Sequence, residues 1–460
     1  MSTGFRDIHS RMKALAARQA SEKEARVAAL QGGAVEGVLS ASEHFRRREA
    51  KPDPPKLAPE LGGIDGAERR TSALGTTIVR RLAFAADRAD VFGPRFTGPP
   101  AALPAPALTA LSKDFTGDAP LPIESVAFLD TETTGLAGGT GTLAFLIAVG
   151  WWEGPTFHLG QFLVEDFAHE ADQLARLEER LSRFAAICTY NGRTFDIPLL
   201  RSRYLLARRR PSVLAKPQLD LLGFSRRMWR GVLPSCSLKN VEAGALRIDR
   251  GPDIDGAQVP ALFFEAARSG RLEPLVPVLA HNAQDVVTLG ALLPFLSQLA
   301  ANPLGSGLVE RWGEWAAVAR WLESTGRHSE AAEAWTRAVD RHDGRDRGEE
   351  RALLLRLARA HKRGGQWEKA LATWNQFLRG PVRHGIEAWI ELAKYHERVA
   401  RDPAAALSLV GRGLRQAQLD EDLAHYSGSG ANDALAAFRS DFQQRQARLR
   451  ARLARLGASA

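Results

Sequence analysis

The stretch that decides the fold is Ser125-Val126-Ala127-Phe128-Leu129-Asp130-Thr131-Glu132-Thr133-Thr134-Gly135-Leu136. Its apolar start favours a short β-strand that ends at Asp130. Because successive strand residues point to opposite faces, Asp130 and Glu132 project from the same face. Two neighbouring carboxylates repel each other unless a cation lies between them, and hard divalent cations such as magnesium take oxygen ligands. We therefore expect a strand that ends in a candidate metal site.

Outward from this strand, the pattern is that of an α/β domain. Apolar runs at 143–152 and 156–164 flank the turn Glu153-Gly154-Pro155 and predict a hairpin. The sequence further predicts a helix at about 169–184, a strand at 186–190, a helix at 195–207 and a last helix from about 272 to 299. Antiparallel strands followed by alternating helices and strands predict a mixed sheet over residues 121–300.

Two further motifs carry carboxylates. The run Tyr190-Asn191-Gly192-Arg193-Thr194-Phe195-Asp196 predicts a strand end, a turn and a helix that opens at Asp196. That carboxylate is suited to a metal ligand or to a simple helix cap. In His281-Asn282-Ala283-Gln284-Asp285, the imidazole and the last carboxylate are four residues apart on one helix face. Such a pair alone is typical of a surface interaction, but the three motifs together, in this order, are far more specific.

The three motifs resemble those of the DEDD superfamily of 3′→5′ exonucleases, whose fold is ribonuclease-H-like. More closely, the chain is similar to bacterial ribonuclease-H-like proteins with tetratricopeptide repeats, the YprB type. This second similarity also rests on the runs 219–222, 237–242 and 253–256. The resemblance implies that Asp130, Glu132, Asp196 and Asp285 bind two Mg²⁺ or Mn²⁺ ions.

The resemblance also implies roles in catalysis and substrate binding. His281, Asp130 and Glu132 are the candidate catalytic residues, and Thr133, Asn191 and Lys239 are candidates for substrate binding. The superfamily has a Tyr four residues before its last Asp or a His five before it, whereas His281 stands four before Asp285. Two roles therefore stay open for His281: a general base near neutral pH, or a residue that packs on its own helix.

The segments outside the α/β domain differ in character. Residues 1–60 are a charged, partly disordered extension, and residues 61–120 combine a short β-containing segment with a linker. Residues 308–420 contain three similar segments, which align at Ala331, Ala370 and Ala406. These offsets are close to the tetratricopeptide period and predict an all-α repeat domain. Residues 421–460 are expected to form a basic C-terminal helix.

Composition narrows the setting of the protein. The formal net charge of +9 fits a nucleic-acid partner, DNA or RNA, although an arginine-rich composition alone gives the same number. The two cysteines, Cys188 and Cys236, show no disulfide or zinc spacing, which favours a reducing cytoplasm. The sequence contains no run of about 18 apolar residues, so no membrane-spanning helix is expected. The repeats offer a surface for a protein partner.

The function expected from the sequence is metal-dependent hydrolysis of phosphodiester bonds from a 3′ end. Two alternatives stay open. One is an endonuclease that uses the same site. The other is a nucleic-acid-binding scaffold with little or no turnover, which docks partners through its repeats.

Overall fold

The computed structural model describes residues 64–135, 141–426 and 433–457. The expected N-terminal extension, residues 1–60, lies outside the described residues. Every element discussed below belongs to one compact unit, residues 63–136 together with 143–460.

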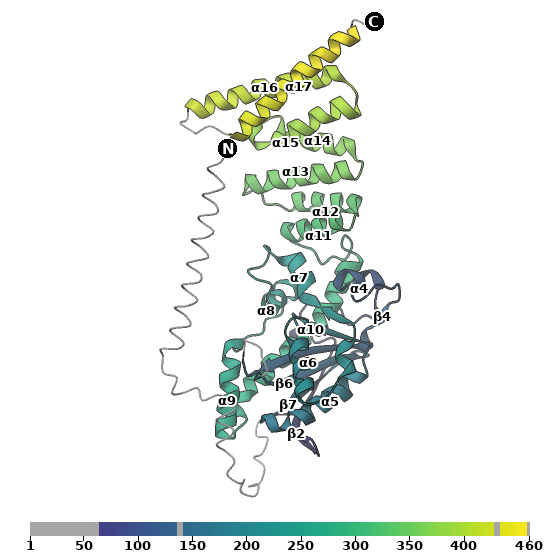
Figure 1. Cartoon of the computed structure of the whole chain (residues 1–460), viewed down its shortest axis with the longest axis vertical. Helices are drawn as coiled ribbons and strands as arrows, with labels where there is room; N and C mark the ends of the chain where they lie inside the picture. The colour runs from purple at the N-terminus through teal and green to yellow at the C-terminus, as the bar shows by residue number, and fades with distance from the viewer. Residues whose placement is uncertain (1–63, 136–140, 427–432, 458–460) are drawn as a thin grey trace. The chain divides into compact units, whose positions relative to one another are not determined.

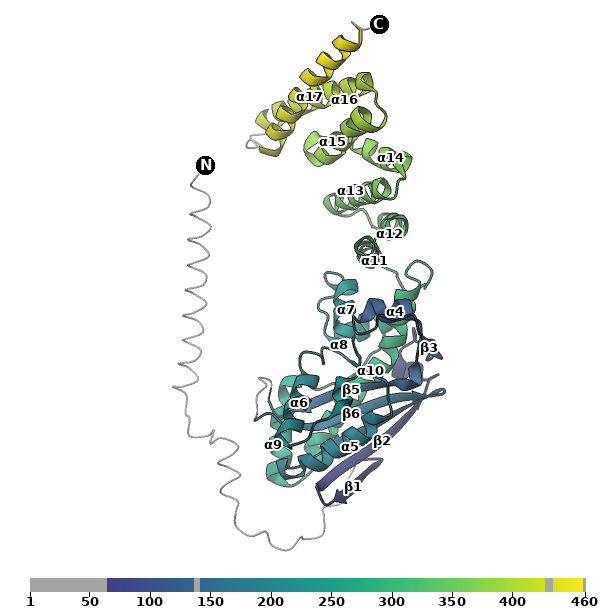
Figure 2. The ribbon, with the colours of Figure 1, turned by 45° about the vertical axis from the view of Figure 1, so that its right-hand side comes forward.

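The centre of this unit is a seven-stranded mixed sheet in the order β1-β2-β7-β6-β5-β8-β9. Figure 2 shows β5, β6, β2 and β1 in sequence toward the sheet edge. The strands are β1 (Ala67–Ser72), β2 (Gly75–Ala85), β5 (Val126–Thr133), β6 (Ala144–Glu153), β7 (Thr156–Leu163), β8 (Ala186–Thr189) and β9 (Gln218–Asp220), and β3 (Ala102–Leu103) and β4 (Leu121–Pro122) form a separate ribbon. Strand β5 pairs antiparallel with β6 and parallel with β8. The predicted hairpin and mixed ribonuclease-H-like sheet are confirmed.

Helices cover both faces of the sheet and continue beyond it (Figure 1). The helices up to residue 301 are α3 (Ala89–Phe92), α4 (Ala105–Leu111), α5 (Glu170–Ser182), α6 (Asp196–Leu206), α7 (Leu221–Trp229), α8 (Leu238–Val241), α9 (Val259–Ser269) and α10 (Val276–Ala301). The later ones are α11 (Trp312–Ser324), α12 (His328–Asp340), α13 (Arg347–Arg363), α14 (Trp367–Phe377), α15 (Ile386–Lys394), α16 (Pro403–Tyr426) and α17 (Asp433–Gly457).

Each face of the sheet packs against a different helix set. Leu174, Leu177 and Leu181 recur at helical spacing in α5 and pack with α6 on the face that carries Leu129. Helix α10 packs on the opposite face, against Phe128 and its neighbours. The segment Glu273–Ala301, which includes α10, is long and apolar enough to cross a membrane, but 83% of its most apolar window is buried within the protein. Its place in the core accounts for its apolar composition.

Helix α10 approaches the sheet closely around one aromatic ring. Phe157 of β7 lies between Gly150 of β6 and Gly290 of α10. A Cβ atom at Gly290 would lie 2.5 Å from the Phe157 ring, and one at Gly150 would overlap both this ring and Val286. Trp152 Nε1 also donates a hydrogen bond to the Gly290 carbonyl at 3.1 Å. The absence of side chains at these two glycines sets the distance between α10 and the sheet.

The sheet begins earlier in the chain than predicted. Strands β1 and β2 were expected in a separate segment, residues 61–120, yet β2 pairs with β7 over eight residue pairs of the same sheet. Helix α4, in the expected linker, packs on α10 through Leu108 and Leu111. The segment was misassigned because a strand's own sequence does not state which partner it pairs with.

Residues 312–426 form paired antiparallel helices, as the repeated pattern predicts. Ala331, Ala370 and Ala406 are each the fourth residue of α12, α14 and α16, and all three are fully buried. Small side chains at these points let neighbouring helices pack closely, because no larger group separates their backbones. The predicted equivalence of the three alanines therefore agrees with their positions. The paired helices end with α16 at Tyr426 and are followed by α17.

The hydrophobic core does not stop at residue 300. Phe224 of α7 contacts Trp321 of α11 edge-on, with ring centroids 5.3 Å apart. Trp229 Nε1 donates a buried hydrogen bond to Glu314 Oε1 at 3.1 Å. One cluster of buried side chains continues from the sheet through α10 and α11 to Leu357 in α13. The first helix pairs thus complete the core of the α/β domain.

This shared core changes the result expected from truncation. All candidate metal ligands precede residue 300, which on the sequence alone predicts that residues 1–300 fold independently. We now expect that fragment to be largely insoluble, because it exposes the α7 surface that α11 covers. A fragment ending at Gly365 keeps the cluster whole and should be soluble with a cooperative thermal transition. Soluble yield and circular-dichroism melts of the two fragments check this, and a stable fragment 1–300 would contradict it.

Candidate active site

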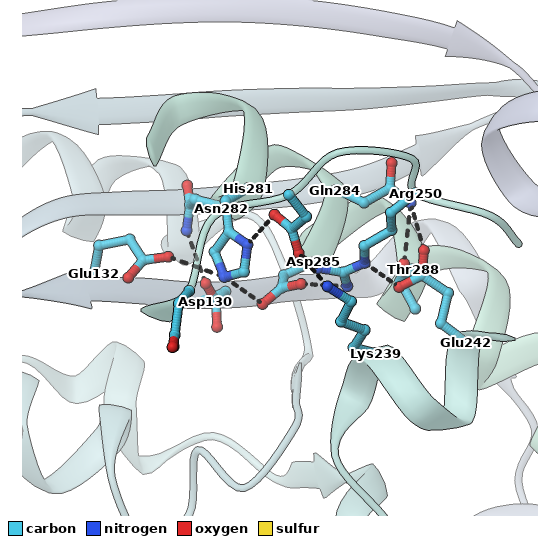
Figure 3. Close-up of polar contacts among 12 residues, drawn as sticks. Asp130, Glu132, Lys239, Glu242, Arg250, His281, Asn282, Gln284, Asp285 and Thr288 are labelled. Atoms are coloured by element: carbon cyan, nitrogen blue, oxygen red, sulfur yellow. Dashed lines mark hydrogen bonds and ion pairs between the residues drawn. The ribbon is translucent and has the colours of Figure 1, made fainter. Parts of the chain in front are cut away.

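Asp130 and Glu132 lie at the carboxyl end of β5, on the face that α10 covers (Figure 3). The pairing with β6 shifts register between Glu132 and Thr133, so the regular ladder ends there. Irregular pairing of this kind at a strand end can re-aim a side chain. Thr131 points to the opposite face, since it alternates with its neighbours.

A row of polar side chains crosses the sheet from Asp130. In register with Asp130 lie Ala148 of β6, Gln161 of β7 and Arg80 of β2. Arg80 Nη1 donates to the side-chain oxygen of Gln161, Oε1, at 3.2 Å, and Gln161 Nε2 donates to Asn282 Oδ1 at 2.9 Å. Asn282 Nδ2 in turn donates to Asp130 Oδ2 at 2.8 Å. Because Gln161 and Asn282 are fully buried, this series of hydrogen bonds fixes the Asp130 carboxylate and joins α10 to the sheet.

Asp196 reaches the same strand end from the other face. It is the first residue of α6, and Thr131 Oγ1 donates to its Oδ1 at 2.5 Å. The turn before α6 starts at Asn191, whose φ of 67° lies in the left-handed region that Asn tolerates. Asp220 holds this turn by accepting the backbone N–H groups of Asn191 at 2.8 Å and Arg193 at 3.1 Å. Asp220 thus positions Asp196 indirectly, and it also caps α7.

His281 and Asp285 face the β5 carboxylates from α10. His281 Nδ1 lies 2.7 Å from Asp253 Oδ1. His281 Nε2 lies 3.8 Å from Asp285 Oδ2 and 4.0 Å from Glu132 Oε1. Because a carboxylate accepts and cannot donate, Nδ1 carries the proton and Nε2 faces the carboxylate cluster. Figure 3 shows the His281 ring beside Asp285, with Glu132 on its other side.

Arg250 connects the cluster to the chain that follows α8. Its side chain is buried, and its Nη2 donates to Asp285 Oδ1 at 2.5 Å. Its Nε donates to Glu242 Oε2, also at 2.5 Å, and its Nη1 lies 3.5 Å from Asp253 Oδ2. Gln284 Nε2 donates to the other Glu242 oxygen at 3.0 Å. The Arg250 guanidinium thus orients Asp285 and also lies beside Asp253, the carboxylate that contacts His281.

The carboxylates strongly perturb one another. Burial raises the pKa of Asp130 well above its usual range, and the charges of Asp285, Asp196 and Glu132 raise it further. Burial raises the pKa of Glu132 to about 8, with Asp285 and Asp196 adding to the effect. Burial also raises the pKa of Asp196 to about 6, although the Thr131 hydrogen bond opposes this. Buried carboxylates in mutual repulsion create a strong demand for positive charge.

The comparison with known proteins agrees with this arrangement. A protein-family model described as RNase_H superfamily matches residues 127–296, which run from β5 to α10 and include all four carboxylates. The "Uncharacterized protein YprB" of Bacillus subtilis (strain 168) is 30% identical over 294 residues, which are 63% of this chain and 69% of that protein. The chain belongs to the RNase_H superfamily. Its RNase_H domain is therefore the part of the chain that carries the candidate active site.

The four carboxylates of the RNase_H domain are oxygen donors of the type that a hard divalent cation takes. In the part of the chain that the structure describes, no group of three His, Cys, Asp or Glu side chains is close enough to hold one ion. Internal donors nevertheless engage one oxygen of Asp130, Asp196 and Asp285 each, namely Asn282, Thr131 and Arg250. Mg²⁺ and Mn²⁺ bind carboxylate oxygens, above all where few positively charged side chains compensate the carboxylates.

The three candidate substrate-binding residues of the RNase_H domain lie at different distances from the cluster. Thr133 ends β5, where its hydroxyl donates to the Gly135 carbonyl at 2.9 Å. Lys239 lies at the rim, largely exposed, with Nζ 3.5 Å from Asp253 Oδ2. Asn191 starts the turn before α6, and its side-chain oxygen accepts a hydrogen bond from Thr194 at 3.3 Å. Thr133 follows Glu132 in β5, Lys239 contacts Asp253 beside His281, and Asn191 shapes the turn that presents Asp196.

Four residues of the RNase_H site were missed by sequence reasoning: Gln161, Arg250, Asp253 and Asn282. Asn282 stands beside His281 in a quoted motif, but its bond to Asp130 joins residues 152 positions apart. Arg250 and Asp253 lie in an irregular segment, and their spacing matches no ligand pattern. The run 253–256 had been noted as a point of similarity only, without a role for Asp253.

Replacing Asn282 with Ala should weaken both the fold and the site. The change leaves buried polar atoms of Gln161 and Asp130 without this partner, which costs about 1–3 kcal/mol in the free energy of unfolding. Urea denaturation of the metal-free protein measures this loss. Replacement of Gln298 with Ala is the control, because that exposed α10 side chain donates a surface hydrogen bond to the Ser306 carbonyl at 3.3 Å. If both variants lose the same free energy of unfolding, the hydrogen bonds that connect Arg80, Gln161, Asn282 and Asp130 add no stability.

Proposed function

We propose that this protein is a metal-dependent nuclease that hydrolyses phosphodiester bonds of DNA or RNA from the 3′ end. The observation that carries the proposal is the convergence of Asp130, Glu132, Asp196 and Asp285 at the end of β5. These four carboxylates, of which Asp196 is buried and the other three are half-buried, come from β5, α6 and α10, and His281 faces them. A structural ion-pair network would pair such groups with cations, whereas here Arg250 is the one guanidinium hydrogen-bonded to any of the four among the described residues.

The four carboxylates are the groups that would hold two Mg²⁺ or Mn²⁺ ions. When bound, such ions polarise the phosphodiester and stabilise the charge that develops on the attacking and leaving oxygens. The side chains themselves supply position. Asn282, Thr131 and Arg250 each orient one carboxylate from a different side, which fixes the donor set before substrate arrives.

His281 is the proposed general base. Asp253 accepts the Nδ1 proton at 2.7 Å, which leaves the Nε2 lone pair directed toward Glu132 and Asp285. From that position Nε2 can take a proton from the water that attacks phosphorus. The same hydrogen bond stabilises the positive charge that the imidazole gains. The one-residue difference from the superfamily spacing therefore leaves the imidazole facing the cluster.

The paired helices after residue 311 are proposed to be tetratricopeptide-like repeats that dock a protein partner. The equivalent buried alanines support a true repeat, because each occupies the same turn of its helix. A cytoplasmic setting is proposed as well, since both cysteines, Cys188 and Cys236, are free thiols.

One experiment tests the proposed function directly. The full chain is incubated with 3′- or 5′-labelled single- and double-stranded DNA and RNA, with Mg²⁺, with Mn²⁺ or with EDTA. A 3′→5′ exonuclease releases labelled mononucleotides at once from 3′-labelled strands and gives a shortening ladder from 5′-labelled strands. Cleavage of a circular single strand would show an endonuclease instead. Binding of the substrates without any cleavage under every condition would support the scaffold.

A further inference from the structure

A second charged site lies on the α5 face of the sheet, at its β1–β2 edge. It is a pocket of about 230 Å³ with an apolar floor made by Val79 and Phe162. Its walls carry five arginines, which come from β1, from β2, from α5 and from the residue after α5: Arg70, Arg81, Arg176, Arg180 and Arg183. We call it the arginine pocket.

Carboxylates compensate only part of this charge. Arg70 and Arg81 share a single carboxylate, Glu68, at 2.7 and 2.8 Å. Arg176 is paired with Asp172 at 2.7 Å, and that carboxylate also accepts hydrogen bonds from two hydroxyl groups of β1 and β2. Glu179 is the third carboxylate and lines the pocket itself. Five guanidinium groups therefore face three carboxylates.

Arg180 and Arg183 hold the excess positive charge. Among the described residues, neither guanidinium has a carboxylate within ion-pair distance. Arg180 lies over the Trp151 ring, 4.4 Å from its centroid, which fixes the guanidinium in place. Partial burial, and then the charges of Arg183 and Arg81, lower the pKa of Arg180. Guanidinium groups held close together in this way favour an anion between them.

The arginine pocket lies on the opposite face of the sheet from Asp130 and Glu132. Arg81 of β2 is opposite Gly160 of β7, which is opposite Val149 of β6, which is opposite Leu129 of β5. Leu129 alternates with Asp130, so the side chains of Arg81 and Asp130 point to opposite faces. The pocket is therefore separate from the carboxylate cluster, and a strand that reaches both has to pass around the sheet.

We propose that the arginine pocket binds the phosphate backbone of a nucleic-acid strand outside the candidate active site. The proposal rests on the proposed function, since it takes the substrate to be a nucleic-acid strand. Guanidinium groups match phosphate oxygens in paired hydrogen bonds, and such contacts hold a strand without reading its bases. The apolar floor offers no acceptor that would compete with phosphate for the guanidinium donors.

Binding measured without turnover tests this proposal. The full chain is titrated, in EDTA, into fluorescently labelled oligothymidylates of 20 and 2 nucleotides, and anisotropy gives the affinities. We expect the double variant Arg180→Gln/Arg183→Gln to bind the 20-mer about ten-fold more weakly. Its salt dependence should be less steep by about 1.4 in log Kd against log salt concentration, about 0.7 for each lost contact. Affinity for the dinucleotide should not change.

Two further variants keep the test independent of folding and of total charge. Glu179→Gln removes the carboxylate that lines the pocket and should tighten binding of the 20-mer. Arg345→Gln/Arg448→Gln removes two exposed arginines of the helical region and should leave binding unchanged.

The outcomes separate this proposal from the proposed function. Equal losses for the two arginine pairs, or no loss at the pocket, would overturn the arginine pocket as a strand site. So would an equal loss for the dinucleotide, because the pocket would then bind a free nucleotide. If the wild-type protein cleaves no substrate but the expected affinity changes are seen, hydrolysis fails and the strand contact stands.

Discussion

Replacing Asp130 with Asn is expected to abolish metal-dependent hydrolysis while the protein stays folded. Asp130 is half-buried, and burial together with the charges of Asp285, Asp196 and Glu132 raises the pKa of its carboxyl well above the usual range. Asn keeps the volume and can still accept the hydrogen bond from Asn282, so the geometry of β5 and α10 is retained. The variant loses one negative charge of the donor set. We expect kcat to fall by at least about a thousand-fold, the equivalent of roughly 4 kcal/mol of transition-state stabilisation.

Although Asp130→Asn should abolish hydrolysis, it should stabilise the metal-free protein. Removal of one of four mutually repelling buried carboxylates should raise its melting temperature, because the remaining charges are less crowded. Mg²⁺ or Mn²⁺ should stabilise the wild-type protein and have little effect on the Asp130→Asn variant. Thermal melts with and without metal, beside labelled-strand cleavage assays, measure both effects.

A matched control for this prediction is Asp90→Asn. Asp90 is exposed and pairs only with Arg88 in a short surface ion pair. This variant should keep wild-type cleavage and the wild-type response to metal. Cleavage that survives in EDTA, or that is unchanged in the Asp130→Asn variant, would exclude the two-metal site.

Replacing His281 with Ala is expected to lower kcat by about 10²–10⁴-fold, the contribution typical of a positioned base. Nucleic-acid affinity should change little, because the imidazole faces the carboxylates rather than the rim where Lys239 lies. Asp253→Asn should give a smaller loss in kcat, since it replaces the charged acceptor that orients Nδ1 at 2.7 Å with a neutral amide oxygen but leaves the imidazole in place. Single-turnover cleavage rates and anisotropy separate the effect on chemistry from the effect on binding.

His425→Ala is the control for this series, because His425 is an exposed residue in the last turn of α16. It should retain full activity. If His281→Ala also retains near-wild-type kcat, the imidazole is a packing residue and another group accepts the proton. A loss of affinity with unchanged kcat would assign His281 to substrate binding instead.

Much of the fold follows from local patterns. The alternation and turn at 143–164 predict the β6–β7 hairpin, and the strand that carries Asp130 is visible as a buried run. The helix that opens at Asp196 is visible because a turn motif precedes it. These features are predictable because each depends on residues that are near one another in the sequence.

The parts that sequence reading missed depend on long-range pairing. Whether 75–85 is a separate segment or a strand of the main sheet depends on β7, and nothing in β2 alone identifies that partner. The continuity of the core past residue 300 depends on the contact of Phe224 with Trp321, nearly one hundred positions apart. Both errors arose from placing boundaries at changes of composition.

The candidate site shows the same division. Asp130, Glu132, Asp196, Asp285 and His281 were identified from motifs, and the structure brings them together at the end of β5. Arg250, Asp253 and Asn282 act on those groups through single hydrogen bonds to distant residues. Such partners depend on register and on helix rotation, which a motif does not record.

The close packing of Phe157 between Gly150 and Gly290 limits how this protein can be redesigned. Asp285 and Gly290 lie on the same helix, about 7.5 Å apart along its axis at 1.5 Å per residue. A methyl group at either glycine would push α10 outward and take His281 and Asp285 away from β5. Substitutions at Lys239 or in the arginine pocket leave this packing intact. Gly150 and Gly290, in contrast, have no room for a side chain larger than hydrogen, although neither residue lies in the candidate active site.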